Sequence, residues 1–345
     1  MRRRAIAYAL LSAALFGAST PLAKIFVGSM APLALAGLLY LCSGIGLAAW
    51  LAVRRQFPRL SLAGLEFVWL AGAIIAGGMV GPALLMYGLA RTDAASASLL
   101  LNLEAVMTAA LAWVAFRENV DRRVFTGMAA IVAGGVILSW QQAPHTGNTA
   151  GPALIAAACL AWALDNNLTR RISGGNAVVI AALKGLIAGA TNLMLALALG
   201  AHLPAPGAFA AAGLVGLVGY GVSLVLFIMA LRDLGTARTS AYFSIAPFFG
   251  AALALGLLGE RPESAFWIAA ALMGLGAWLH ISEHHEHDHV HEPMAHTHEH
   301  AHDAHHRHSH EPGWDGREPH THRHEHGRLR HRHPHYPDLH HRHEH

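Results

Sequence analysis

The sequence predicts an all-α integral membrane protein with ten transmembrane helices, arranged as two inverted five-helix repeats and followed by a disordered tail. Three observations predict it: a series of long apolar segments, an uneven distribution of arginine among their loops, and an internal repeat. The composition agrees, because 54% of the 345 residues are hydrophobic and 13% are charged, about half the charged share of a soluble domain. We therefore expect the lipid bilayer as a partner, and neither a soluble enzyme nor a nucleic-acid-binding protein.

Each apolar segment is close to the roughly 20 residues that a helix needs to cross a bilayer. Short breaks with glycine, proline or arginine separate the segments, as at residues 28–32 and 204–207. The first segment follows Arg2–Arg4 as in a signal peptide, but its length, Pro21 and Lys24 favour a retained helix. The expected spans are residues 6–27, 31–53, 67–90, 94–116, 124–140, 151–168, 176–199, 210–231, 236–258 and 264–282.

The arginines indicate how the segments cross the membrane. With a cytoplasmic N-terminus, 13 arginines lie in cytoplasmic loops and two, Arg91 and Arg261, lie in outer loops. Cytoplasmic loops of membrane proteins carry an excess of lysine and arginine. We therefore predict a multi-pass protein of the cell (inner) membrane whose N- and C-termini are both cytoplasmic.

The chain resembles itself at an offset of 142 residues. In both halves an apolar helix rich in small residues ends at a glutamate, Glu118 or Glu260, which we expect to terminate the helix. Because each half holds five spans, the second half must enter the membrane from the opposite side, as in the inverted repeats of secondary transporters. The predicted domains are a first repeat over 1–140, a second over 150–282 and a tail over 283–345.

Several short motifs occur in a defined order along the two halves. They are ALFGASTP at Ala14–Pro21, LNLEA at Leu101–Ala105, FRE at Phe116–Glu118, IAP at Ile245–Pro247 and LGE at Leu258–Glu260. Over residues 5–282 this order resembles the drug/metabolite transporter superfamily, specifically its members with two EamA domains. The resemblance implies ten helices around a central cavity and transport of small solutes, often outward. Ala105 departs from the proline that the family usually has there, whereas Pro247 keeps it.

Other classes of protein lack their motifs in this sequence. No phosphate-binding glycine loop followed by lysine and serine or threonine is present, and no His-Glu-x-x-His motif occurs within the spans. We therefore expect no catalytic residues, no enzyme activity and no required cofactor. A channel and a metal sensor anchored in the membrane are alternatives, although an anchor would need only one helix.

Polar and ionisable residues within the spans are the candidates for a binding site, because a charge at the bilayer centre costs roughly 3 kcal/mol or more. Glu104 lies near the middle of its span, close to Asn102. Since burial favours a neutral carboxyl group, Glu104 is expected either to exchange protons or bind a cation, or to pack between helices as a neutral group. Asp165, Asn166 and Asn167, which follow Trp162, correspond to Ser19–Pro21 of the first half at an offset of 146. They predict a site at the repeat interface or a polar helix end.

Four further candidates have two interpretations each. Lys24 would either pair with Glu104 or a substrate carboxylate, or extend to the outer surface. Lys184 has the same alternatives on the cytoplasmic side. Tyr220 and Tyr242 would line the cavity or lie at the membrane interface.

A histidine-rich tail follows the last span, and 24 of the 27 histidines occur from His284 onward. Such a polar, low-complexity segment is expected to be disordered. A spacing of two residues places imidazoles on one side of an extended chain, where they could bind Zn, Ni, Co or Cu. The expected ligands are His285, His287, His289, His291, His296, His298, His300, His302, His320, His322, His324 and His326.

The sequence thus favours a secondary transporter, an exporter, of a small polar metabolite such as an amino acid, working by alternating access around a central cavity. The alternative is an efflux transporter for Ni, Co or Zn that the histidine tail feeds or gates. Against it, the spans contain no cluster of histidine or cysteine. The substrate, direction, coupling ion and formation of a homodimer stay open.

Overall fold

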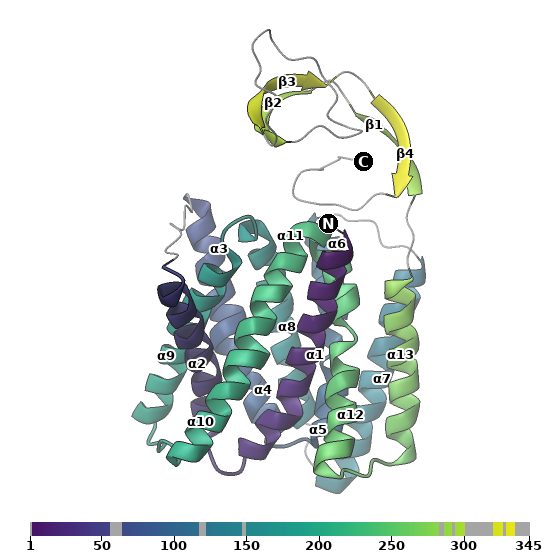
Figure 1. Cartoon of the computed structure of the whole chain (residues 1–345). Helices are drawn as coiled ribbons and strands as arrows, with labels where there is room; N and C mark the ends of the chain where they lie inside the picture. The colour runs from purple at the N-terminus through teal and green to yellow at the C-terminus, as the bar shows by residue number, and fades with distance from the viewer. Residues whose placement is uncertain are drawn as a thin grey trace. The chain divides into compact units, whose positions relative to one another are not determined.

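The computed structural model describes residues 2–55, 64–116, 122–146, 150–282, 286–291, 294–300, 320–326 and 329–334. The helices up to residue 282 belong to one structural unit and the strands after it to another. In the helical unit the helices run side by side along one common direction (Figure 1).

Helices of the first half begin and end close to the expected boundaries. Two spans are composite: the third contains a π-helix, η1, and the fourth has a break at residues 101–102. Local signals explain several boundaries, since Pro32 begins α2 and the Asp93 side chain accepts a hydrogen bond from the Ser96 N–H at the start of α5. The elements are α1 Arg2–Phe26, α2 Pro32–Val53, α3 Leu65–Ala73, η1 Ile74–Val80, α4 Gly81–Leu89, α5 Ala94–Leu100, α6 Leu103–Phe116 and α7 Arg122–Thr146.

The second half repeats this pattern. A π-helix, η2, lies 142 residues after η1, and a break at residues 244–245 corresponds to the one at 101–102. Gly235, with a φ of 75°, interrupts α11 between the eighth and ninth expected spans. The elements are α8 Ala150–Ile172, α9 Ala177–Ala198, α10 Pro206–Val215, η2 Gly216–Val222, α11 Ser223–Phe243, α12 Ala246–Leu258 and α13 Ser264–Ile281.

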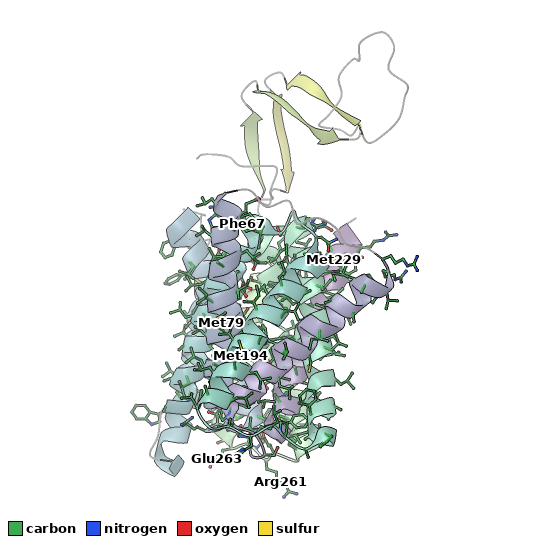
Figure 2. The ribbon with its side chains drawn as sticks, turned by 90° about the vertical axis from the view of Figure 1, so that its left-hand side faces the viewer. Phe67, Met79, Met194, Met229, Arg261 and Glu263 are labelled. Atoms are coloured by element: carbon green, nitrogen blue, oxygen red, sulfur yellow. The ribbon has the colours of Figure 1, made fainter. Side chains whose placement is uncertain are left out.

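These helices account for the ten expected spans. Within the part of the chain that the structure describes, seven helical stretches are long and apolar enough to cross a bilayer, and two shorter apolar helices cover residues 125–140 and 264–279. The tenth span is α8, whose polar residues 165–167 reduce its apolar character. Figure 2 places Phe67 and Met229 near one end of the bundle and Arg261 and Glu263 at the other, as the alternation of spans requires. Which end faces the cytoplasm stays a prediction.

Contacts between the two halves hold the bundle together. The second helices of each half, α2 and α9, pack so closely that a Cβ on Gly185 would lie 2.6 Å from the Gly44 nitrogen. At the end of the bundle near Arg261, both carboxylate oxygens of Glu260 accept hydrogen bonds from the first N–H groups of α5, those of Ala94 and Ala95, each at 2.8 Å. Glu260 therefore caps a helix of the opposite half as well as following its own.

The described residues of the tail form four short strands, and the expected disorder of the tail stays a prediction. β1 Glu286–His291 pairs antiparallel with β4 Leu329–Pro334, and β2 Met294–His300 pairs antiparallel with β3 His320–His326. The alternation of histidine with other residues has the period of a β-strand, which gives a physical reason for extended structure in this composition.

Thiol labelling tests the orientation of the bundle in the membrane. In a background without Cys42 and Cys159, we expect a membrane-impermeant thiol reagent to label cysteines at the exposed positions Ser29 and Arg261 in intact cells. A cysteine at the exposed position Gly174 should react only after permeabilisation. Labelling of the cysteine at 174 in intact cells, with none at 29, would invert the predicted topology.

Candidate functional site

Two adjoining cavities lie between the two halves, and they share Phe16, Glu104 and Phe243. The aromatic cavity is further lined by Tyr40, Trp162, Asp165, Asn166, Gly219, Tyr220, Ser223, Leu224 and Phe227. The hydroxyl cavity is further lined by Gly17, Thr20, Ser98, Leu101, Ala105, Thr108, Ser240, Ser244, Ala246 and Pro247. Each cavity draws residues from both halves, as a site at a repeat interface requires.

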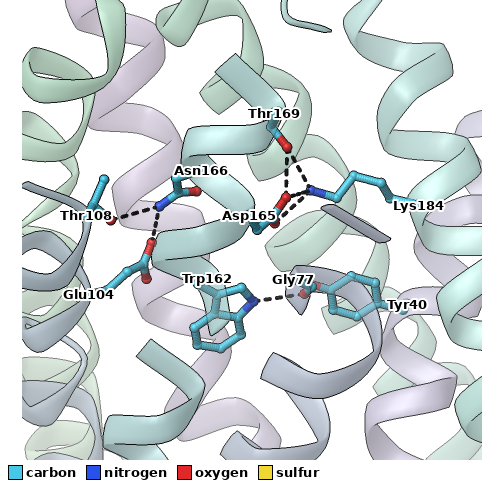
Figure 3. Close-up of polar contacts among 9 residues, drawn as sticks. All are labelled: Tyr40, Gly77, Glu104, Thr108, Trp162, Asp165, Asn166, Thr169 and Lys184. Atoms are coloured by element: carbon cyan, nitrogen blue, oxygen red, sulfur yellow. Dashed lines mark hydrogen bonds and ion pairs between the residues drawn. The ribbon is translucent and has the colours of Figure 1, made fainter. Parts of the chain in front are cut away.

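Glu104 stands between the two cavities. The break after α5 places it in the first turn of α6, where the positive end of the helix favours a carboxylate. Its side chain is 8% exposed, and Asn166 Nδ2 donates a hydrogen bond to Glu104 Oε1 at 2.8 Å (Figure 3). The same amide lies 3.4 Å from Thr108 Oγ1. Both residues were predicted to lie at a site, and the structure brings them together.

Asp165, the neighbour of Asn166 on α8, points to the other side, toward α9 (Figure 3). Lys184 Nζ lies 2.5 and 2.7 Å from the two Asp165 carboxylate oxygens, and Thr169 Oγ1 donates to Oδ1 at 2.8 Å. Asp165 and Lys184 are both buried. The sequence left open whether Lys184 pairs with a carboxylate or extends to the surface. In the structure it forms an ion pair inside the bundle and does not extend to the surface.

The π-helix η1 shapes the wall beside this ion pair. A Cβ on Gly77 would lie 1.8 Å from Asp165 Oδ2, so a larger residue there would have to displace Asp165. The extra residue in a π-helical turn disturbs the regular backbone bonding, and the Gly77 carbonyl accepts hydrogen bonds from Tyr40 Oη and Trp162 Nε1, each at 2.9 Å. Trp162 was expected at the site, whereas Tyr40 was not.

Aromatic rings line the first cavity. The Phe16 ring lies 5.6 Å from Trp162 and 5.7 Å from Tyr220, and Tyr40 lies 5.3 Å from Tyr220. The predicted residue Tyr220 is therefore part of the cavity wall. Phe16 was missed, although it corresponds to Trp162 at the 146-residue offset that relates Ser19–Pro21 to residues 165–167.

Three predicted residues lie elsewhere. Lys24 does not pair with Glu104, because its Nζ donates to the carbonyls of Leu89 and Thr92 at 2.6 and 2.7 Å. Asn102 donates to the Leu99 carbonyl and faces Met273 on α13, away from both cavities. Tyr242 packs beside a small apolar cluster of α1 and α11, so that its neighbour Phe243 lines the cavities.

The predicted metal ligands of the tail stay a prediction. Within the described residues, no group of three or more His, Cys, Asp or Glu could hold a metal ion. His285 and His302 lie outside the described residues, and only the backbone is described for the ligands expected in the strands: His287, His289, His291, His296, His298, His300, His320, His322, His324 and His326.

The buried ion pair should dominate the stability of this region. Replacing Lys184→Met leaves the Asp165 charge without its partner, which should lower the free energy of unfolding in detergent by about 3–5 kcal/mol. The double variant D165N/K184M removes both charges and should recover most of the loss. K24M, at a partly exposed lysine that bonds only carbonyls, serves as the matched control. A double variant as unstable as K184M would contradict this assignment.

Comparisons with known proteins agree with this architecture. A model of the EamA-like transporter family matches residues 3–140 and 149–282. An uncharacterized transporter of Methanothermobacter thermautotrophicus is 28% identical over 285 residues, covering 76% of this chain and 82% of its own. The uncharacterized inner membrane transporter YedA of Escherichia coli K12 is 25% identical over 271 residues, covering 75% and 84%.

A solved crystal structure is also similar, with a TM-score of 0.61 and 19% sequence identity. The match covers 79% of this chain and 95% of that one, and at this identity it concerns the fold alone. The family match extends over most of the chain and over both halves. This chain therefore belongs to the EamA-like transporter family, a family of membrane transporters and not of enzymes.

Proposed function

We propose that this chain is a secondary transporter of the inner membrane that exports a small polar metabolite, such as an amino acid, by alternating access around the central cavity. The observation that carries the proposal is the contact of Glu104 with Asn166, which joins the two halves between two cavities. A binding site that both halves complete is what alternating access requires, because the halves must move relative to each other around it.

The electrostatics of Glu104 favour a solute or ion that carries positive charge. An amide hydrogen bond satisfies one oxygen of the carboxyl group but does not compensate its charge, and an uncompensated charge in a buried site is expensive. Glu104 therefore needs a proton or a cationic group from the solute. The ammonium group of an amino acid would provide that charge, and the aromatic cavity beside it would hold an apolar part of the solute.

The contacts of α8 suggest which groups move together. Asp165 and Lys184 both belong to the second half, so the ion pair would travel as one unit. Glu104 and Gly77, in contrast, belong to the first half and bond to Asn166 and Trp162 of the second. Relative motion of the halves would therefore act on these two hydrogen bonds and leave the ion pair intact.

Transport by Glu104→Gln tests the proposal. Proteoliposomes with the purified protein should exchange a labelled solute, found by screening amino acids and other small polar metabolites, in a saturable manner. We expect E104Q to lower this exchange by about 10- to 100-fold, because a hydrogen bond to a charged group contributes roughly 1.5–3 kcal/mol. Tyr242→Phe, outside both cavities, is the matched control and should retain exchange. Exchange by E104Q equal to that of the parent protein would remove Glu104 from the mechanism.

We further infer that the histidine tail binds Zn, Ni, Co or Cu on the cytoplasmic side. The antiparallel register places His296 opposite His324 and His298 opposite His322. Directly opposite residues of paired strands lie on the same face within about 6 Å, and neutral imidazole is a ligand of these metals.

Metal titration tests the tail. The full-length protein should bind Zn or Ni in equilibrium dialysis, and a variant that ends at Ser282 should lose this binding. Acidification below about pH 6 should release the metal because imidazole becomes protonated. Equal binding by the shortened variant would contradict a role for the tail, and metal flux through both variants would favour the metal-efflux alternative.

A further inference from the structure

The hydroxyl cavity contains buried polar groups that the contacts described so far do not use. Thr20 Oγ1, Ser98 Oγ and Ser240 Oγ line it, and none of the three has a hydrogen-bond partner among the described residues. Thr20 and Ser98 are 0% exposed and Ser240 is 8% exposed. Burying a hydroxyl group without a hydrogen-bond partner costs free energy. A ligand that bonds to these hydroxyls would therefore gain more binding free energy than at hydroxyls that already have partners.

The hydroxyls come from corresponding places in the two halves. Ser98 and Ser240 are separated by the repeat offset of 142 residues and lie in α5 and in the last part of α11. Thr20 comes from α1 and corresponds to Asn166 at the offset of 146. The cavity therefore lies where the related helices of both halves meet, directly beside Glu104.

A backbone carbonyl adds a further oxygen. Pro21 has no N–H, so the carbonyl of Gly17, four residues earlier, lacks its usual helical donor. A Cβ on Gly250 would lie 2.7 Å from both the Gly17 carbonyl oxygen and Ser98 Oγ, which shows that these two oxygens are near each other. Together with the Glu104 carboxylate, the cavity offers hydroxyl, carbonyl and carboxylate oxygens and a single negative charge.

The cationic side chains within the nearby spans are already engaged. Lys184 bonds to Asp165, and Lys24 bonds to two carbonyls at the end of α4. Among the described residues, neither cavity has a lysine, arginine or histidine in its wall. An all-oxygen site of this kind suits a hard cation, and one carboxylate matches a single positive charge.

We propose that the hydroxyl cavity is a binding site for a singly charged cation, held by Glu104, Thr20, Ser98 and Ser240. The cation is either a free Na⁺ ion, which accepts oxygen ligands alone, or the ammonium group of a solute, which donates up to three hydrogen bonds. The proposal names the ligand chemistry of the same central cavity and so rests on the proposed transport function.

Thermal unfolding of the purified full-length protein in detergent tests the site independently of transport. A ligand that binds only the native state raises the melting temperature. The measurement compares NaCl, methylammonium chloride and choline chloride at equal ionic strength, with choline as the bulky reference. We expect a higher melting temperature in NaCl or in methylammonium chloride than in choline chloride. A shift in NaCl assigns the site to free Na⁺, and a shift in methylammonium chloride alone assigns it to a solute ammonium.

Matched threonine variants locate the site. Thr20→Val removes one of the proposed ligand hydroxyls, whereas Thr239→Val removes another fully buried hydroxyl that has no described partner and lines neither cavity. T20V and the double variant S98A/S240A should need at least about tenfold more cation for the same shift, equivalent to about 1.4 kcal/mol. T239V should respond as the parent protein does.

Each variant is compared with itself in choline, so a lower basal stability does not obscure the result. If S98A/S240A does not fold, T20V against T239V decides the question. The proposal is overturned if neither cation stabilises the parent protein relative to choline, or if T20V responds like T239V. Cation binding without solute exchange in proteoliposomes would reject the proposed transport function and leave the cation site standing.

Discussion

The placement of buried polar groups on α8 governs the centre of this molecule. Two consecutive residues, Asp165 and Asn166, point to opposite sides of that helix and meet different partners. On one side a lysine compensates the charge of Asp165, so that the interaction is complete within the second half. On the other side a neutral amide meets the carboxylate of Glu104 from the first half, and no lysine, arginine or histidine among the described residues lines the cavities beside it. Consecutive residues of α8 thus bind a lysine of the same half on one side and a carboxylate of the opposite half on the other.

The backbone is nearly symmetric around this centre, but the side chains are not. Gly77 in η1 lies against Asp165, and Gly219 in η2 lies against Ser19, its counterpart in the first half. The same relation connects Phe16 with Trp162. Each half therefore uses a π-helix and its glycine to bring corresponding helices into contact. The carboxylate of Asp165 and the indole nitrogen of Trp162, in contrast, have no equivalent in Ser19 and Phe16. This asymmetry creates two different cavities from one repeated framework.

Much of the fold followed from hydropathy, arginine placement and the repeat, because these depend on local composition and on the bilayer. Glu104, Asp165 and Asn166 were identifiable because polar groups in apolar spans are rare. The partners of these residues were not predictable from the sequence. Lys184 is 19 residues from Asp165 on another helix, and the sequence does not show in which direction a long flexible side chain points. Tyr242 and Phe243 are adjacent, so a small error in helix phase exchanges the residue that lines the cavities for the one that packs outside them. The π-helices have no residue pattern that distinguishes them from the α-helices around them.

The cap that Glu260 forms on α5 has a consequence for how this end of the bundle separates. Its two hydrogen bonds join opposite halves through a carboxylate and two amide groups. Without water, breaking these bonds would leave a carboxylate and two N–H donors without hydrogen-bond partners. In contact with solvent, water hydrates each group and the net loss of free energy is small. If the halves separate here during transport, entry of water and separation would therefore occur together, which would make the opening of this end cooperative instead of gradual.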